Sequence, residues 1–313
     1  MSDLAVRGIF AAPVLPMKPD FEIDWEILRS YIDWVASQDP AGIAMNMDAS
    51  EAPSLSRDEQ REVIEICRNV IADRCPLVSG LIATSTADAV AWGNELKAAG
   101  AQGLAIFPPM PTFLGKPVPG DMIYRYHASI AEDVNLPMIV FQFPVAWGPD
   151  FPPDVLERLA GLPQVVGMKE ASFDAARTTE TVETAKRLPR KIGIMTGSDT
   201  FIFEAFVMGC DGALIGFAAT GTAEMVAMHR AVEQGRYPEA KAIWERFGPL
   251  ARYAWRAPLR DYRPRMKEVL AAQGIIPHAT ARPPQLGVSN GERAELCRLA
   301  VAAGLLNAEP VGV

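Results

Sequence analysis

The stretch VVGMKEAS, residues 165–172, decides how the rest of the chain is interpreted. Two valines, a glycine and a methionine form a short apolar run, typical of a strand that is buried on both faces. Lys169 and Glu170 follow directly, before a loop opens. Side chains alternate along a strand, so Lys169 and Glu170 lie on opposite faces. Gly167 shares the face of the lysine, and we expect it to clear room beneath that side chain.

Apolar runs of this kind recur along the chain, with amphipathic segments of helical periodicity between them. The candidate strands lie at 8–14, 42–47, 76–81, 103–108, 137–143, 165–170, 192–197 and 212–217. Strands that alternate with helices and consist of nearly continuous apolar residues are typical of a parallel sheet covered by helices. Eight such units without a break predict an α/β fold, a (β/α)8 TIM barrel, and not an open sheet.

The barrel is predicted to span residues 1–235 and to carry the functional site. From residue 236 to residue 313 the sequence shows helical patterns and no strand rhythm, which predicts a C-terminal helical appendage. Within the barrel, Ser56 stands three residues before Glu59, a capping box that predicts the start of a helix.

Composition excludes several classes of function. The formal net charge is -8, and the basic residues are scattered, which argues against nucleic acid or an anionic membrane surface as a partner. No window approaches 18 uninterrupted apolar residues, and the N-terminus lacks the pattern of a secretory signal. The 4 cysteines and 3 histidines lack the clustered spacing of a zinc site. We therefore expect a cytoplasmic protein without a metal or an organic cofactor.

Chemistry in a barrel of this kind is found at the carboxyl ends of the strands, where the following loops converge. Lys169 stands at the end of the sixth candidate strand and Asp48 at the end of the second. The candidate substrate-binding residues at or beside the strand ends are Ala49, Ser50, Phe141, Gly197, Ser198 and Leu214.

Two interpretations of Lys169 remain open from its position. If the side chain faces the barrel axis, loss of solvation disfavours the ammonium and lowers its pKa. The neutral amine is then a nucleophile toward carbonyl groups and forms a Schiff base, which acts as an electron sink. Alternatively, the side chain leans outward and pairs with a surface carboxylate.

Several motifs together resemble the dihydrodipicolinate synthase and N-acetylneuraminate lyase family. They are the lysine of VVGMKEAS, FxxP at 141–144, SEAPSLSRDEQ at 50–60, GSD at 197–199 and MGCDGALIG at 208–216. The resemblance covers nearly the whole chain. It implies a (β/α)8 class I aldolase, lyase or dehydratase that binds pyruvate or a longer 2-oxo acid as an imine on Lys169. It also implies a homo-oligomer, a dimer or a tetramer.

The chain departs from the family pattern at several positions, which makes it a divergent member. Residues 47–51 read Met-Asp-Ala-Ser-Glu, where the family usually has Gly-Thr-Thr-Gly-Glu. Phe141 replaces the family's proton-relaying tyrosine, and Ala146 replaces an arginine that binds the carboxylate of the second substrate. Pro109 and Met110 replace the tyrosines that follow the fourth strand. These departures predict a reaction other than dihydrodipicolinate synthesis.

Asp48 is the candidate for the missing proton transfer, because a confined carboxylate near a cation can act as a general base. Alternatively, Asp48 hydrogen-bonds loop amides or the adjacent Ser50. The amides of Ala49 and Ser50, with the Ser50 hydroxyl, are expected to hold the substrate carboxylate. Ser198 is expected to contact the distal part of the substrate, and Asp199 to cap the helix that begins at TFIFEAF.

Phe141, Phe143 and Trp147 fit either an apolar pocket for a substrate substituent or packing beneath the fifth loop, and packing is favoured for Phe143. The leading prediction is a lyase that acts on a 2-oxo acid by aldol cleavage, condensation or dehydration. One alternative is a 2-oxo-acid-binding or regulatory barrel without catalysis. Another is a phosphate-binding barrel that uses the GFAATG loop, residues 216–221, as an anion nest.

Overall fold

The predicted barrel is confirmed. The computed structural model describes residues 4–144, 148–149 and 151–307. Eight parallel strands pair in chain order, and β1 pairs with β8 to close the barrel. The strands are β1 (Gly8–Ala11), β2 (Gly42–Met45), β3 (Leu77–Leu81), β4 (Gly103–Ile106), β5 (Met138–Gln142), β6 (Val165–Glu170), β7 (Gly193–Thr196) and β8 (Gly212–Ile215). Each lies inside its predicted range, because the loops begin before the apolar runs end.

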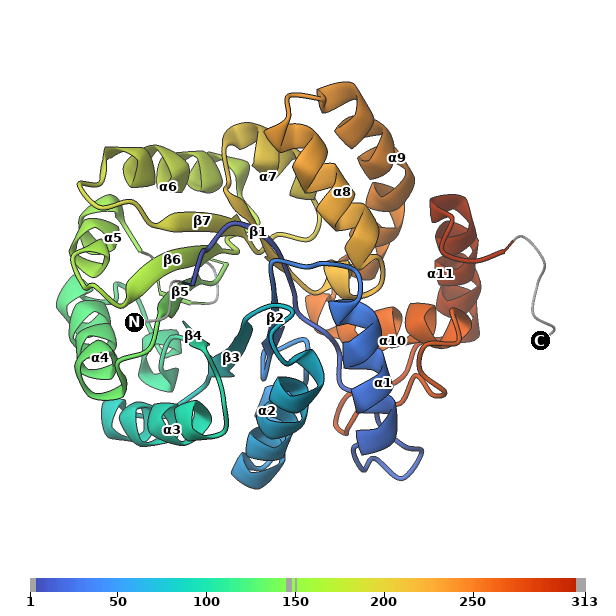
Figure 1. Cartoon of the computed structure of the whole chain (residues 1–313), viewed down its shortest axis with the longest axis horizontal. Helices are drawn as coiled ribbons and strands as arrows, with labels where there is room; N and C mark the ends of the chain where they lie inside the picture. Colours follow the sequence, from blue (N-terminus) through green and yellow to red (C-terminus); the bar gives the residue numbers. More distant parts are fainter. Residues whose placement is uncertain (1–3, 145–147, 150, 308–313) are drawn as a thin grey trace.

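Helices surround the barrel as a ring (Figure 1). Ser56 caps the second helix, and its hydroxyl and the Glu59 carboxylate form the predicted capping box. Short 3-10 turns follow three of the strands: η1 (Ala52–Ser54), η2 (Met110–Phe113) and η3 (Phe217–Ala219). The ring helices are α1 (Trp25–Ala36), α2 (Arg57–Ile71), α3 (Thr86–Ala98), α4 (Gly120–Val134), α5 (Pro153–Ala160), α6 (Ala175–Arg187), α7 (Ile202–Met208) and α8 (Thr222–Glu233).

The C-terminal region is helical, as predicted, and packs on one side of the barrel (Figure 1). Its elements are α9 (Tyr237–Ala254), η4 (Leu259–Asp261), α10 (Tyr262–Ala272) and α11 (Asn290–Ala303). Helix α9 contacts α8, and α11 contacts both α9 and α10. No helix in the described part of the chain is long and apolar enough to cross a membrane.

A buried ion pair fastens α10 to the loop that follows β2. Lys267 is fully buried, and its ammonium donates to the Glu51 carboxylate and to the Thr280 carbonyl. The second oxygen of Glu51 accepts the amide of Arg282 at 2.9 Å. Both charges are therefore compensated, as burial requires. The C-terminal region is thus anchored at the carboxyl ends of the barrel strands.

The amino-terminal end of the barrel is filled by the segment that precedes β1. A Cβ atom added at Gly167 would lie 2.5 Å from Val6 Cγ1 and 2.8 Å from the Gly193 carbonyl. The missing side chain of Gly167 therefore makes room for Val6. The expectation that Gly167 clears space for the lysine is wrong, because the space beside it faces the floor of the barrel.

Candidate active site

A pocket of about 100 Å³ lies at the carboxyl ends of the strands, a size suited to a small organic molecule. The loops after β2, β5, β6 and β7 contribute to it, together with the C-terminal region. The residues that line it are Ala12, Met47, Asp48, Ala49, Phe141, Phe143, Pro144, Lys169, Ala171, Phe173, Gly197, Asp199, Gly216, Trp255, Leu259 and Tyr262. The barrel alone does not carry the site, because three of these residues lie beyond residue 235.

Lys169 reaches this pocket from β6, and the predicted alternation is observed. Its neighbour Glu170 is buried on the opposite face, toward α6. There the Glu170 carboxylate accepts the Ser172 amide at 3.0 Å and the Thr178 hydroxyl at 2.5 Å. Lys169 therefore does not lean outward to a surface carboxylate.

Burial opposes protonation of the Lys169 amine, while the groups around it favour the ammonium. Its Nζ atom lies 4.2 Å from the centroid of the Phe141 ring. Burial lowers the pKa of Lys169 to about 8, and the nearby carboxylates of Asp199 and Asp48 oppose this shift. At that pKa about one amine in ten is unprotonated at pH 7. The pocket thus holds a lysine with nucleophilic character near neutral pH.

Gly197, at the end of β7, provides the room that the lysine needs. A Cβ atom there would lie 2.6 Å from Lys169 Cε and 2.7 Å from Ala171 Cβ. Both contacts are far below normal van der Waals separation, so a larger residue would displace the lysine side chain. Gly197 therefore lines the pocket and shapes the lysine's path.

Asp199 also faces the pocket and does not cap α7. The residue before α7 is Phe201, which makes no side-chain cap hydrogen bond. The Asp199 carboxylate instead accepts the amide of Phe217 at 2.8 Å. Burial raises the pKa of Asp199 to about 7, and the Phe217 hydrogen bond and Lys169 oppose this shift. The predicted cap is wrong, and the pocket gains a second titratable group beside the amine.

Asp48 lies in the pocket, and its carboxylate is held by two side chains of α10. Oδ2 accepts the Tyr262 hydroxyl at 2.9 Å, and Oδ1 accepts Arg263 Nη1 at 2.9 Å. The alternative is wrong, because within the described residues the Asp48 carboxylate bonds neither loop amides nor Ser50. Asp48 is therefore presented to the pocket from β2 and oriented from the C-terminal region.

The loop after β2 brings the amide of Ala49 to the pocket. Ala49 lines the cavity, and its N–H has no hydrogen-bond acceptor among the described residues. Ser50 is fully buried behind it: its amide donates to the Met47 carbonyl at 3.1 Å, and its hydroxyl to the Pro13 carbonyl at 3.0 Å. The groups of Ser50 thus hold the turn, while the Ala49 amide is available for an anion.

Ser198 and Leu214 do not line the pocket. The Ser198 hydroxyl accepts the Phe173 amide at 3.2 Å, and the Ser198 amide donates to the Thr196 hydroxyl at 3.1 Å. Leu214 lies on β8 with no exposed surface, in the apolar core. Ser198 therefore shapes the loop that carries Phe173, and Leu214 supports the sheet.

Aromatic rings form one wall of the pocket. Phe141 and Phe143 are stacked with ring centroids 4.3 Å apart, and Phe107 packs edge-on against both. Phe143 both packs beneath its loop and lines the cavity, so the two interpretations of this residue coexist. Ala146 and Trp147 lie outside the described residues.

Comparison with known proteins assigns the chain to a family. The profile of the Dihydrodipicolinate synthetase family matches residues 5–303, nearly the whole chain. The chain belongs to the Dihydrodipicolinate synthetase family. Its members are class I aldolases and lyases, which is the enzyme class that the sequence predicts.

Named relatives support the same assignment. The 4-hydroxy-tetrahydrodipicolinate synthase of Streptococcus suis is 30% identical over 251 residues, which cover 80% of this chain and 78% of that protein. The enzyme of the same name from Azoarcus sp. is 30% identical over 79% of this chain and 82% of its own.

Solved structures of the family have the same fold. Dihydrodipicolinate synthase from Acinetobacter baumannii, complexed with pyruvate, matches with a TM-score of 0.86 and 26% identity, over 96% of this chain and 100% of its own. The dihydrodipicolinate synthase of Thermotoga maritima matches with a TM-score of 0.88 and 22% identity, over 96% of this chain and 100% of its own, a likeness of fold.

The three pocket residues that come from the C-terminal region were missed from the sequence. Trp255 follows the end of α9, Leu259 lies in η4, and Tyr262 begins α10. The Trp255 and Tyr262 rings stack with centroids 4.8 Å apart. Burial and the neighbouring Asp48 raise the pKa of the Tyr262 phenol well above its usual value. No strand end marks these residues in the sequence, so the rule that locates barrel sites does not find them.

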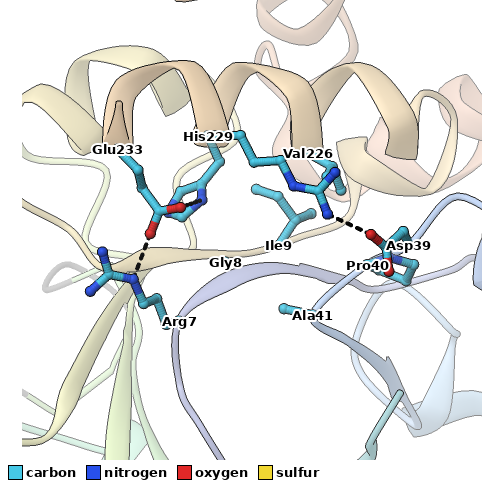
Figure 2. A pocket seen from close by; sticks show the side chains of 10 residues that line it. Arg7, Gly8, Ile9, Asp39, Pro40, Ala41, Val226, His229 and Glu233 are labelled. Carbon is cyan, nitrogen blue, oxygen red and sulfur yellow. Dashed lines mark hydrogen bonds and ion pairs between the residues drawn. The ribbon is translucent and has the colours of Figure 1, made fainter. Parts of the chain in front are cut away.

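A larger cavity of about 320 Å³ lies at the other end of the barrel from the Lys169 pocket (Figure 2). It adjoins the amino-terminal ends of β1 and β2, and its charged side chains pair with one another. Glu233 bonds Arg7 at 2.5 Å and lies 3.5 Å from His229 Nδ1, while Arg230 pairs with Asp39 at 2.5 Å. These charges are compensated locally, and none of them reaches the pocket of Lys169.

Proposed function

We propose that the protein is a lyase that acts on a 2-oxo acid through a Schiff base on Lys169. The observation that carries the proposal is the Lys169 amine, which lines the pocket and whose pKa burial lowers to about 8. Such an amine attacks a ketone carbon, and the resulting imine withdraws electrons from the neighbouring carbon. A solved relative 26% identical to this chain is described as complexed with pyruvate, which supports a 2-oxo acid as the ligand.

The neighbouring groups fit the steps of imine formation. Asp199, whose pKa is raised to about 7, takes the proton that the ammonium of Lys169 releases. The neutral nitrogen then adds to the ketone, and the ketone oxygen leaves as water. The amide of Ala49, which is free of other acceptors in the described part of the chain, holds the substrate carboxylate.

Asp48 is the proposed general base of the later steps. Its carboxylate lines the same pocket as Lys169, and the chain has Phe141 and no tyrosine on β5. A phenyl ring neither donates nor accepts a proton, so the acid-base work falls to another group. The Asp48 carboxylate is close enough to Lys169 to oppose the lowering of the lysine pKa, which supports a role for Asp48 beside the imine.

The walls of the pocket favour a reaction other than dihydrodipicolinate synthesis. Lys169 is the only basic side chain among the described lining residues, and the imine uses it. Phe143, Pro144, Phe173 and Leu259 form an apolar outer wall. A second carboxylate would lose its hydration there without a cationic partner, which is costly. We therefore propose substrates whose distal group is neutral and apolar.

A panel of substrates tests this proposal. Pyruvate release from 4-hydroxy-2-oxo acids would be measured with distal groups that are aromatic, alkyl or carboxylate. We expect cleavage of the neutral members to exceed that of the carboxylate member at least tenfold in kcat/KM. Rapid condensation of pyruvate with aspartate semialdehyde would contradict the assigned specificity. Binding of 2-oxo acids without turnover or imine formation would identify a binding barrel without catalysis.

We also propose that the enzyme is a cytoplasmic homo-oligomer, a dimer or a tetramer. The support is a set of exposed apolar side chains in the segment after β4, at Met110, Phe113, Leu114 and Met122, where Met110 is 60% exposed and Leu114 80%. Clusters of exposed apolar side chains are common at interfaces between subunits. Light scattering after gel filtration would give the mass, and a monomer at micromolar concentration would contradict the proposal.

A further inference from the structure

We propose that Tyr262 transfers protons between the imine-bound substrate and Asp48. Tyr262 thereby supplies, from the C-terminal region, the hydroxyl that Phe141 lacks. This inference rests on the proposed function, because it assigns a residue to the chemistry that follows the imine on Lys169. It deepens that function by naming the group that contacts the reacting carbon.

The position of Tyr262 carries the proposal. Its side chain is buried and lines the same cavity as Lys169 and Asp48. The Tyr262 hydroxyl donates to Asp48 Oδ2 at 2.9 Å, a normal hydrogen bond. Stacking against Trp255, with centroids 4.8 Å apart and planes 23° apart, fixes the orientation of the phenol ring. A phenol and a carboxylate are thus joined at the edge of the pocket.

The other titratable groups of the described pocket are committed elsewhere. Lys169 becomes the imine nitrogen. Asp199 accepts the amide of Phe217 from the end of β8 and exchanges its proton with the amine. Asp48 and Tyr262 remain, and they are hydrogen-bonded to each other.

The anchoring of α10 keeps the two groups together. Arg263, the next residue of the helix, donates to Asp48 Oδ1 at 2.9 Å and to the Asp48 carbonyl at 3.3 Å. One turn further, the buried Lys267 binds Glu51, three residues after Asp48. The loop after β2 and the start of α10 are therefore tied at three points. Arg263 and Lys267 act as positioning residues for the pair.

The transfer balances as follows for the imine of pyruvate. The C3–H bond breaks, and its proton moves to the Tyr262 oxygen while the phenol proton moves to Asp48 Oδ2. The electron pair of that bond forms the C2–C3 double bond of the enamine, and the C2–N π electrons neutralise the iminium nitrogen. The reverse transfer returns a proton to C3. The phenol stays protonated at neutral pH, since its pKa is raised well above the usual value, and so it relays protons without storing charge.

Exchange of the pyruvate methyl protons in D2O measures this step. Proton NMR would follow loss of the methyl signal with wild-type protein and with Tyr262→Phe, Asp48→Asn and the double variant. Borohydride trapping of pyruvate would be measured in parallel, because imine formation does not need the relay. Tyr253→Phe is the matched control: Tyr253 lies on α9, contacts Arg256, and does not line the pocket.

We expect Tyr262→Phe to be trapped by borohydride like the wild type, while its exchange rate falls about 100-fold or more, the usual contribution of a general acid-base group. The double variant should lose no more than either single variant, because the two residues act as a unit. Exchange within threefold of wild type in Tyr262→Phe, or losses that add in the double variant, would overturn the relay. Failure of the wild type itself to be trapped would instead remove the proposed function.

A thermal melt separates the relay from a purely structural role. If Tyr262→Phe melts like the wild type and loses exchange, the hydroxyl acts in proton transfer. If it melts lower and keeps its exchange rate, the hydroxyl only fastens α10 to the loop after β2, and the proposal is overturned. Should Tyr262→Phe fail to fold, Asp48→Asn keeps the relay falsifiable: exchange within threefold of wild type in that variant would overturn it, because the relay needs the Asp48 carboxylate as its final acceptor.

Discussion

A Cβ atom at Gly197 would lie 2.6 Å from Lys169 Cε, so β7 has no side chain at the point where the lysine of β6 crosses it. The absence of a side chain at Gly197 leaves room for the Lys169 side chain to pass β7 and reach the pocket. It also joins the motifs VVGMKEAS and GSD through Lys169 and Gly197, which lie 28 positions apart in the printed sequence.

Gly197→Ala should therefore displace the lysine. We expect the rate of borohydride trapping with pyruvate to fall at least tenfold, and the free energy of unfolding to drop by about 1–3 kcal/mol, as overpacking typically costs. Gly115→Ala is the control, because a Cβ atom at Gly115 has no neighbour within 4 Å. If Gly197→Ala is trapped at the wild-type rate, the Lys169 side chain reaches the pocket without needing the space at Gly197.

The rate of adduct formation should rise with pH through about 8. Below the lowered pKa of Lys169 the amine is protonated and unreactive, so each further pH unit downward reduces the rate about tenfold. Above that pKa the rate should level off. Stopped-flow measurement of imine formation between pH 6 and pH 10 would give the profile, and a midpoint near the ordinary lysine value would contradict the desolvated environment.

Asp199→Asn should move that midpoint to lower pH. Burial lowers the pKa of Lys169 and the Asp199 carboxylate raises it, so removing that charge should lower the lysine pKa further. The same variant would lose a proton acceptor beside the amine, and its trapping rate at pH 7 reports both effects. A midpoint that moves upward would contradict the assigned electrostatics.

Lys267→Met should destabilise the fold strongly. The substitution leaves the buried Glu51 carboxylate without its ammonium partner, a loss that typically costs about 3–5 kcal/mol. Denaturant unfolding would measure it, and adding Glu51→Gln should recover part of the loss. Lys241→Met is the control, since the pair of Lys241 with Glu245 is exposed and should contribute little.

Much of the fold could be predicted from the sequence because period and composition are local signals. The eight apolar runs and the capping box at Ser56 were read directly, and each corresponds to an observed element. Strand alternation predicted that Lys169 and Glu170 lie on opposite faces, but it left open which of the two faces the pocket. The strand ends were less certain, because apolar residues continue into loops that close over the pocket.

The site was predicted only where it depends on single strands. Lys169, Asp48, Ala49, Phe141 and Gly197 line the pocket. The contact of Tyr262 with Asp48 spans 214 positions and depends on how α10 docks, which no local pattern encodes.

Two errors at the strand ends have a common cause. The position of Asp199 before a helix predicts a cap, whereas its carboxylate accepts the amide of Phe217 after the neighbouring strand. The lysine's space was assigned to Gly167 on its own strand, but it comes from Gly197 on the neighbouring one. In both cases the deciding contact is made between adjacent strands, and reading one segment at a time does not reveal it.

The most direct measurement is peptide mapping after borohydride reduction in the presence of pyruvate. The account predicts a single reduced pyruvate adduct, located on Lys169, and no adduct in Lys169→Arg. An adduct on another lysine, or none at saturating pyruvate and pH 8, would contradict the central claim that this amine is the nucleophile.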